Sequence, residues 1–256
     1  MASITMFIIL LMSKSGLLFS SGSMINAFFP DFFINSVFDS PIDICDSVFN
    51  GRSSFQNTKF NSSSKFENLI FKGDTIFCTS YFGDDVSFYL SNFNSIADFS
   101  KTYLMGRSSF NRTIFLGPVS FEDSEFTNAS SFLLSRFDND TTFKNANFHK
   151  NTSFRSAIFA KSISFRNSNF MNLADFGLVS FNGSTDFGYS NFRGTFELTK
   201  TKINYLENFI WPYFINKIKC DDQVTFSELI RNFRNLRNFE AANEMYFQYC
   251  ELEGIG

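Results

Sequence analysis

The 256-residue chain is poor in the residues that build metal and catalytic sites. It contains one histidine, His149, and four cysteines, none of which forms a CxxC pair. Zinc sites need Cys and His ligands at short, fixed spacings, so the sequence indicates no metal site. His149 has no catalytic partner at a fixed spacing, and a surface position is the ordinary one for it. We expect free thiols at all four cysteines, with a Cys220–Cys250 bridge only in an oxidising compartment; the four are Cys45, Cys78, Cys220 and Cys250.

An excess of charge of one sign is also missing. The chain has 22 Lys and Arg against 25 Asp and Glu, which gives a net charge of −3. Residues 49–198 carry fourteen basic and thirteen acidic side chains. Nucleic-acid binding depends on a clustered positive charge, so a nucleic acid is not expected as a partner.

Long apolar runs are absent as well. The run at residues 4–12 is nine residues long, which is too short for a membrane-spanning helix. It has the length of a signal-peptide core, but no Lys or Arg precedes it and Lys14 follows. Two interpretations of residues 1–27 stay open: a signal-like segment, or an apolar cap. The protein is secreted if residues 1–23 act as a signal, and otherwise a cytoplasmic or membrane-associated location is favoured.

Phenylalanine is abundant, with 40 copies, and it recurs at alternating steps of five and six residues. Of the 26 positions in the two resulting rows, 25 are Phe and one is Leu, so the period of eleven is not accidental. The first row is Phe55, Phe66, Phe77, Phe88, Phe99, Phe110, Phe121, Phe132, Phe143, Phe154, Phe165, Phe176, Phe187. The second row is Phe60, Phe71, Phe82, Phe93, Leu104, Phe115, Phe126, Phe137, Phe148, Phe159, Phe170, Phe181, Phe192.

This period excludes a helix and a flat strand. A helical seam needs apolar spacings of three and four, and the filler residues are Ser, Asn, Thr, Asp and Gly, which form helices poorly. In a strand, steps of five and six cannot both keep side chains on one face. The chain must therefore turn a corner between successive Phe residues. The position two before each Phe is small or β-branched in most copies, as at Thr58 and Ser80, and we expect it to point inward too.

The two kinds of step predict two kinds of corner. Gly or Asn recurs two positions after the second-row Phe, and these residues tolerate a left-handed backbone. We therefore expect the left-handed corner in the six-residue step, at Gly73, Gly106, Gly117, Asn128, Asn139, Asn172, Gly183 and Gly194.

The pattern resembles the pentapeptide-repeat family in its Phe-centred variety, with motifs such as Ala157-Ile158-Phe159. The resemblance covers roughly residues 33–198 and implies an all-β solenoid, a right-handed quadrilateral parallel β-helix. Weaker copies from Phe28 onward place this domain at residues 28–198. The alternating sixth residue predicts coils of twenty-two residues, two repeats each, so that Phe77 stacks on Phe99 and Phe88 stacks on Phe66 and Phe110.

Residues 199–256 read as an aromatic connector followed by a short α-helical hairpin. We expect the connector, with Phe209, Trp211 and Phe214, to cover the last coil. Thr225 and Glu228 form a capping-box pattern, and a second helix of about residues 239–252 ends near Gly254. We expect Phe226, Leu229, Ile230 and Phe233 to pack against Met245, Tyr246 and Tyr249. The other side carries a row for an acidic partner or an anionic membrane surface, namely Arg231, Arg234 and Arg237. Similar hairpins follow Phe-type repeats in some microbial members of the family, where they can lead into membrane-bound segments.

A repeat of this kind specifies an architecture more clearly than an activity. We expect no catalytic, cofactor or metal residues, no enzyme activity and no small-molecule substrate. The first hypothesis is a non-enzymatic scaffold that offers rigid faces to an unknown protein partner. The alternatives are a DNA mimic that acts on topoisomerase, which the near-neutral repeat disfavours, and a surface- or carbohydrate-binding solenoid. The last rests on an outward hydroxyl and carboxylate array before the first-row Phe, which we interpret first as structural: Ser87, Asp98, Ser109, Ser120, Ser131, Thr142, Ser153, Ser164, Asp175 and Asp186.

Overall fold

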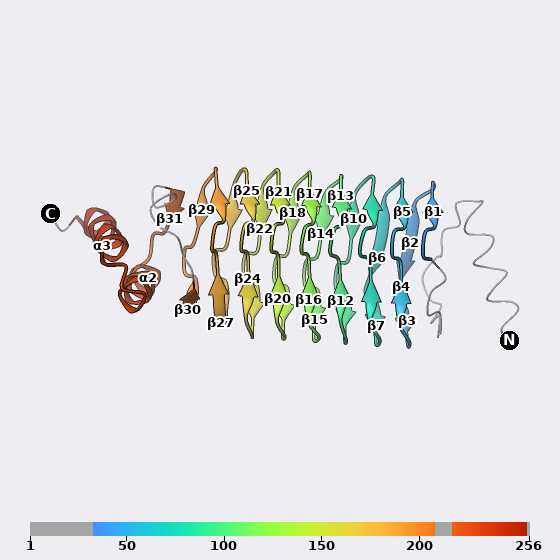
Figure 1. The fold of residues 1–256 in the computed structure, drawn as a ribbon, viewed down its shortest axis with the longest axis horizontal. Helices are drawn as coiled ribbons and strands as arrows, with labels where there is room; N and C mark the ends of the chain where they lie inside the picture. The colour runs from blue at the N-terminus through green and yellow to red at the C-terminus, as the bar shows by residue number, and fades with distance from the viewer. Residues whose placement is uncertain (1–32, 208–216, 255–256) are drawn as a thin grey trace, which may run out of the picture.

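The computed structural model describes residues 33–207 and 217–254. It is a parallel β-solenoid of about eight turns, elongated along one axis, with two helices beyond its C-terminal end (Figure 1). The N-terminal segment 1–27 and the connector residues Phe209, Trp211 and Phe214 lie outside the described residues.

Each coil places short strands on four faces, which we name after their first strands. The β1 face contains β1 (Val37–Phe38), β5 (Lys59–Phe60), β9 (Tyr81–Phe82), β13 (Tyr103–Leu104), β17 (Glu125–Phe126), β21 (Asn147–Phe148), β25 (Asn169–Phe170) and β28 (Asn191–Phe192). The β2 face contains β2 (Ile42–Cys45), β6 (Ser64–Glu67), β10 (Val86–Ser87), β14 (Ser108–Ser109), β18 (Ser130–Ser131), β22 (Thr152–Ser153), β26 (Ala174–Asp175), β29 (Phe196–Glu197) and β31 (Ile218–Lys219).

The remaining two faces join into one sheet. The β3 face contains β3 (Val48–Phe49), β7 (Ile70–Phe71), β11 (Asn92–Phe93), β15 (Ile114–Phe115), β19 (Arg136–Phe137) and β23 (Ile158–Phe159). The β4 face contains β4 (Ser53–Ser54), β8 (Thr75–Ile76), β12 (Ala97–Asp98), β16 (Val119–Ser120), β20 (Thr141–Thr142) and β24 (Ile163–Ser164). A longer strand, β27 (Ser180–Asp186), runs through the corner and pairs with β23, β24 and β30 (Lys202–Glu207).

The strand register confirms the coil of twenty-two residues. Tyr81 and Phe82 pair with Tyr103 and Leu104, twenty-two positions on. The Phe77 ring stacks on Phe99 at 5.1 Å and 5°, but meets Phe88 edge-on at 5.3 Å and 78°. Phe88 stacks in turn on Phe66 at 5.2 Å and on Phe110 at 5.0 Å. Like rings therefore stack along the axis, while neighbouring columns meet in the edge-to-face geometry that aromatic quadrupoles prefer.

The interior consists of these rings and the small residues beside them. All 26 ladder positions are at most 3 % exposed, and residues two before them, such as Thr58, Ser80 and Ser91, are fully buried. Most of the buried hydroxyls are paired: Ser80 Oγ donates to Phe55 O and Ser91 Oγ to Phe66 O, each at 2.6 Å, whereas the hydroxyls of Ser54, Ser108 and Thr185 have no partner within the described residues. At most coils Ser and Thr therefore occupy the inward small position without the cost of an unpaired polar group.

The corner assignment from the sequence is wrong. The left-handed residue lies two positions after the first-row Phe, in the five-residue step, and sixteen non-glycine residues from Asn35 to Lys200 occupy it at intervals of eleven. Gly106 and Gly117, in contrast, do not adopt positive φ. A Cβ on either glycine would lie 2.3 Å from backbone atoms of the preceding coil, at Asp84 and Ser95. Glycine is used there because the coils approach closely, not because of the corner's backbone angles.

Leucine at a left-handed corner is a source of strain that a substitution can relieve. Leu134 has φ 57° and its side chain is 46 % exposed, whereas Asn145 and Asn167 occupy equivalent corners. Because Asn visits this conformation readily, Leu134→Asn is expected to raise the free energy of unfolding by about 1 kcal/mol. Denaturant unfolding measures the change at constant slope. Leu133→Asn, one residue earlier and not left-handed, is the control and is expected to give no gain.

The coil register continues past Leu198, where the sequence analysis placed the end of the repeat. Lys202 and Ile203 pair with Ser180 and Phe181, and β31 pairs with β29, all twenty-two residues apart. Two helices follow, α2 (Gln223–Asn235) and α3 (Phe239–Glu253). In Figure 1, α2 lies next to the last coil and α3 lies farther out.

Candidate interaction surfaces

The outward hydroxyl and carboxylate array forms two columns on different faces, because each coil contains two repeats. Asp98, Ser120, Thr142, Ser164 and Asp186 lie on the β4 face, and the other five residues lie on the β2 face. Many of these side chains accept a hydrogen bond from the amide two residues on. Glu122 N donates to Ser120 Oγ at 3.3 Å and Gly188 N donates to Asp186 Oδ1 at 2.8 Å. Such local bonds secure the corner and occupy the groups that a repetitive ligand would need.

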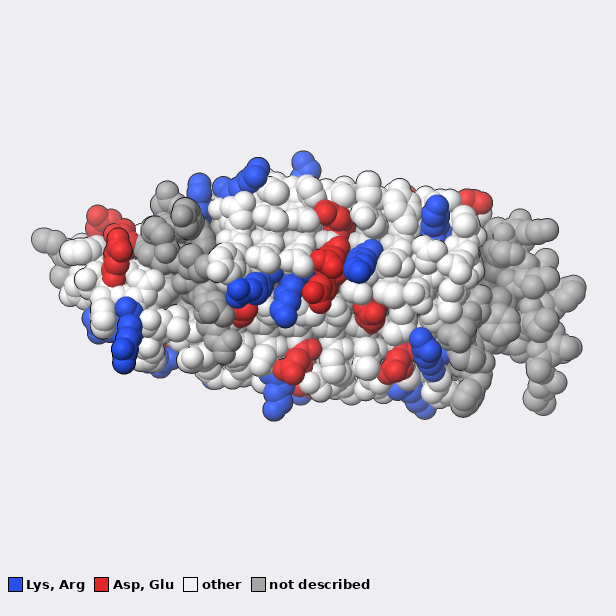
Figure 2. Space-filling view, in the orientation of Figure 1, with Lys and Arg blue, Asp and Glu red and all other residues white. Residues whose placement is uncertain are grey.

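Both of these faces are hollowed, since their outward residues are small. The groove on the β4 face has a volume of about 890 Å³ and extends from Ile76 to Asp186. Its charged lining consists of Asp98, Lys101, Glu122, Asp123, Asp140, Lys144 and Asp186. The groove on the β2 face is about 480 Å³ and contains Lys65, Asp85 and Arg107. Acidic and basic side chains are mixed on the face shown in Figure 2, where most of the surface is uncharged.

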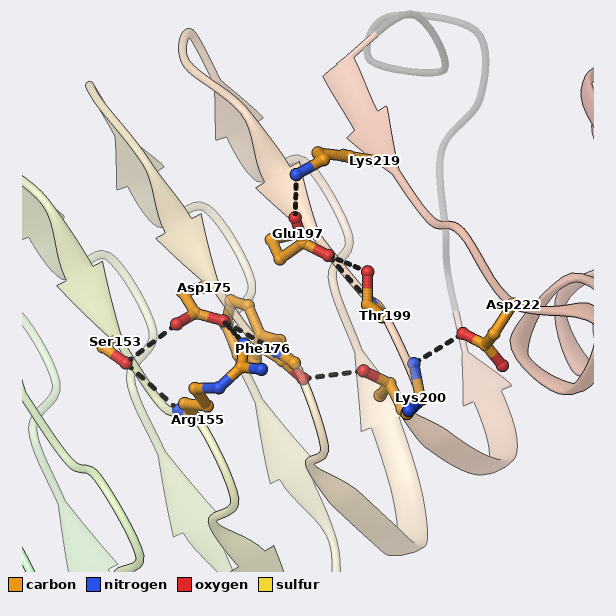
Figure 3. A network of polar contacts seen from close by, with 11 residues as sticks. Ser153, Arg155, Asp175, Phe176, Glu197, Thr199, Lys200, Lys219 and Asp222 are labelled. Atoms are coloured by element: carbon orange, nitrogen blue, oxygen red, sulfur yellow. Dashed lines mark hydrogen bonds and ion pairs between the residues drawn. The ribbon is translucent and has the colours of Figure 1, made fainter. Parts of the chain in front are cut away.

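The acidic residues at the C-terminal end of the β2 face are paired within the protein. Asp175 accepts from Ser153 Oγ at 3.2 Å and lies 3.5 Å from Arg155 Nη1 (Figure 3). Glu197 lies 3.3 Å from Lys219 Nζ and also accepts from Thr199 N at 3.0 Å. These contacts link successive coils and hold β31 on β29. The network therefore has a structural role.

Helix α2 and its N-cap cover the last coil with a row of polar side chains, the capping row Asp222, Thr225, Glu228 and Asn232. Lys200 N donates to Asp222 Oδ2 at 2.5 Å, whereas the equivalent amide one coil earlier, Leu178 N, donates to Thr199 O. The same row accepts from three further backbone amides: Thr201 N to Thr225 Oγ1 at 3.0 Å, Ile203 N to Glu228 Oε2 at 2.6 Å, and Leu206 N to Asn232 Oδ1 at 3.1 Å. These side chains take the place of a further coil and satisfy amides that an open sheet end leaves unpaired.

Helix α2 begins three residues earlier than the capping-box pattern predicted. Asp222, not Thr225, is the N-cap of α2, and its Oδ1 accepts from Thr225 N at 2.9 Å. The Thr225 hydroxyl accepts from Thr201 N at 3.0 Å and lies within hydrogen-bond distance of two acceptors, Asp222 Oδ1 at 3.0 Å and Thr201 O at 3.3 Å. Gly254 ends α3 with φ 66°, as predicted from the sequence. In the sequence, the residues of the capping row are recognisable only as polar residues at helical spacing, and their bonds to the backbone amides of the last coil are not.

The hairpin's interior is partly as predicted. Phe226, Leu229, Phe233 and Met245 are buried, and the Phe226 ring lies 5.7 Å from that of Tyr249. The predicted packing of Tyr246 is wrong, because this side chain is 51 % exposed. The small residues Ala241 and Ala242 are buried, and their size lets the helices approach closely.

The outer surface of the hairpin combines arginine and aromatic side chains. Arg231, Arg234 and Arg237 are exposed, and within the described residues no carboxylate lies within 4.0 Å of them. Arg231 Nη2 donates weakly to Ile203 O at 3.4 Å. On α3, Phe239 and Phe247 are 62 % and 63 % exposed. Exposed aromatic groups of this size are typical of interaction sites.

The described part of the chain contains no cluster of His, Cys, Asp or Glu suited to a metal ion. His149 Nε2 lies 2.9 Å from Glu125 Oε2 on the surface. Burial raises the pKa of Cys220 to about 12, and burial together with a hydrogen bond to Asp43 raises the pKa of Cys45 to about 12. Both are thiols at neutral pH, so neither is an activated nucleophile. Within the described residues, no helix has the length and apolar character to cross a membrane.

Comparison with known proteins agrees with this geometry. A family model described as pentapeptide repeats (9 copies) matches residues 110–158, in the middle of the solenoid. The Phe ladder continues through the match without a change of period on either side. The chain is a pentapeptide-repeat protein. No curated protein matches the chain.

Proposed function

We propose that this pentapeptide-repeat protein is a non-catalytic scaffold that presents its C-terminal hairpin to a protein partner. The proposal rests on a difference between the two helices: one caps the solenoid and the other exposes aromatic side chains. Helix α2 supplies the polar groups that cap β30, while α3 packs on α2 and leaves Phe239, Tyr246 and Phe247 more than half exposed. Capping explains α2 but gives no reason for the aromatic surface of α3.

The solenoid suits the role of a stiff support. Successive coils are joined by parallel strand pairs throughout the described coils, and stacked rings fill the interior. Short corners connect the strands, and no long insertion interrupts residues 37–207 to build a catalytic cleft. A partner bound at the hairpin would therefore be held at a fixed distance from the other end of the solenoid.

The chemistry of the hairpin indicates the kind of partner. Arg231, Arg234 and Arg237 favour a surface that carries carboxylates, and the α3 aromatic residues favour an apolar pocket beside it. Tyr, Phe and Arg are enriched at the centres of protein interfaces. We therefore expect an acidic protein surface with an adjoining hydrophobic recess.

Site-specific photo-crosslinking in the native cell tests this proposal. A photoreactive residue at Phe247 is expected to capture a small set of proteins that the same residue at Tyr103, 52 % exposed on the β1 face, does not capture. Substituting the three arginines with Gln is expected to reduce that capture at least about tenfold, which corresponds to a loss of about 1.4 kcal/mol. Equal capture from both positions, or capture unaffected by the Arg substitutions, would contradict the proposal.

The DNA-mimic alternative has a direct test of its own. Mimicry requires a continuous column of negative charge, whereas the acidic residues of the β4 groove alternate with Lys101 and Lys144. We expect purified gyrase to supercoil DNA at the same rate with and without this protein. Inhibition at stoichiometric concentrations would instead support mimicry.

A further inference from the structure

A zigzag of aliphatic side chains runs along the edge between the β2 and β3 faces. One member comes from each of six consecutive coils, alternately from the outward position of a β3-face strand and from the left-handed corner before it. The members are Ile70, Leu90, Ile114, Leu134, Ile158 and Leu178. Four of them are 40–46 % exposed, and Ile70 and Ile114 are half-buried. The spacing is regular, since each column repeats every 44 residues, or two coils.

Three members of this zigzag are maintained at an unfavourable backbone position. Leu90, Leu134 and Leu178 have φ of 59°, 57° and 60°. The same corner carries Asn68 in an earlier coil, and the opposite corner carries Asn57, Asn145 and Asn167, so a residue suited to the conformation is readily accommodated. The left-handed corner is common to all sixteen positions and also carries Lys101, Arg112 and Tyr189, so the backbone strain belongs to the architecture and only the choice of leucine at these exposed positions points to a function.

The surrounding charges have one predominant sign. The β3 face and this edge carry five basic residues, Lys72, Arg112, Arg136, Lys200 and Lys202, against three acidic ones, Asp46, Glu67 and Asp138, of which Asp138 pairs with Arg136. The whole chain has a net charge of −3, so this surface is unusually positive for the molecule. Arg112 lies between Leu90 and Leu134 in the corner column and has no acidic partner within 4.0 Å among the described residues.

The zigzag matches the apolar seam of an amphipathic α-helix. Its members advance by one coil, about 4.8 Å, and alternate from side to side. In a helix, successive a and d positions of a heptad also alternate and advance by about 5.2 Å. Over five steps the two spans are about 24 Å and about 26 Å, a difference that side-chain flexibility absorbs.

We propose that this edge binds an amphipathic helix of a partner protein, with leucine-type residues in its seam and acidic residues flanking the seam. The partner helix would lie along the solenoid axis, with its apolar residues between the isoleucine and leucine columns. Its flanking carboxylates would meet Arg112, whereas Arg136 already pairs with Asp138 at 2.6 Å. This site is separate from the hairpin, and its failure would leave the hairpin proposal unaffected.

The test uses a synthetic peptide of about 20 residues, the length that spans the zigzag. The peptide has Leu at positions a and d and Glu at e and g, and it is used below its self-association concentration. Fluorescence anisotropy with the full-length protein is expected to show saturable binding. A matched peptide with Lys at e and g is expected to bind at least about tenfold more weakly, since the surface is basic.

A triple variant separates binding from folding. Leu90→Asn, Leu134→Asn and Leu178→Asn together are expected to weaken peptide binding at least about tenfold while raising the denaturation midpoint, because Asn suits the left-handed corner. Tyr103→Asn on the β1 face is the control and is expected to leave binding unchanged.

Three results would overturn the inference. One is the absence of binding of the Glu peptide, or equal binding of the Lys peptide. Another is binding to vesicles of phosphatidylcholine and phosphatidylglycerol in place of the peptide. If the wild-type protein sediments with these vesicles and the triple variant does not, the edge binds a lipid surface. The third is a dimeric mass in light scattering that the triple variant loses, which would assign it to a second copy of the chain.

Discussion

We expect Phe121→Ala to lower the free energy of unfolding by about 3–5 kcal/mol, because the truncation opens a cavity in a fully buried column. The Phe121 ring stacks on Phe99 at 4.9 Å and on Phe143 at 4.7 Å, and it meets Phe110 edge-on at 5.1 Å. These neighbours are fixed by their own coils, whose strands are paired on both sides. The column therefore cannot collapse into the cavity, and the cost is expected near the upper end of the range.

Ser120→Ala is the control for this prediction. Ser120 is adjacent in sequence but points outward, and its hydroxyl accepts one bond from Glu122 N at 3.3 Å. Its loss is expected to change the unfolding free energy by no more than about 0.5 kcal/mol. The comparison is made by denaturant unfolding of the full-length protein. Similar losses for the two variants would refute the inward and outward assignment.

The second large effect is expected from the capping row. Glu228→Ala combined with Asn232→Ala leaves the amides of Ile203 and Leu206 without their acceptors at the end of the solenoid. An unpaired buried amide costs about 1–3 kcal/mol, so the double variant is expected to lose about 2–5 kcal/mol. It is also expected to associate end to end, since an open sheet edge pairs with another chain.

A matched pair on α3 controls for the change in composition. Glu240→Ala with Asn243→Ala removes the same residue types from exposed positions on α3. This variant is expected to stay monomeric and within about 0.5 kcal/mol of the wild type. Light scattering gives the mass, and thermal unfolding gives the stability. If the Glu228 and Asn232 variant remains monomeric and equally stable, α2 does not cap the solenoid.

The corner residues show where sequence reasoning reached its limit. The existence of two corner types follows from the steps of five and six, and the structure confirms it. Their assignment does not follow, because Asn occurs at both places, for example at Asn57 and Asn128. Only the stacked coils show that Gly106 is needed for close backbone approach, and that Leu134 is left-handed.

The C-terminal region shows the same limit at the scale of an element. Amphipathic helices were predictable from the spacing of Phe226, Leu229 and Phe233, and Gly254 marked the end of the second one. The partners of the polar residues were not predictable, since Glu228 and Asn232 meet amides 25 and 26 residues away. Their role depends on where α2 lies against β30, which no local pattern encodes.

The sequence by itself determined the parallel solenoid, the twenty-two-residue coil, and the inward positions of the Phe ladder and its small neighbours. It did so because a strict period forces every coil to repeat the same inward and outward choice, so local pattern and global fold coincide. The tertiary structure alone decided the conformation of each corner, the division of the hydroxyl array between two faces, the capping by α2, and the aliphatic zigzag beside the β3 face. These features arise from contacts between residues of different coils, or between a helix and a coil, and such contacts exist only after the chain has been wound and stacked.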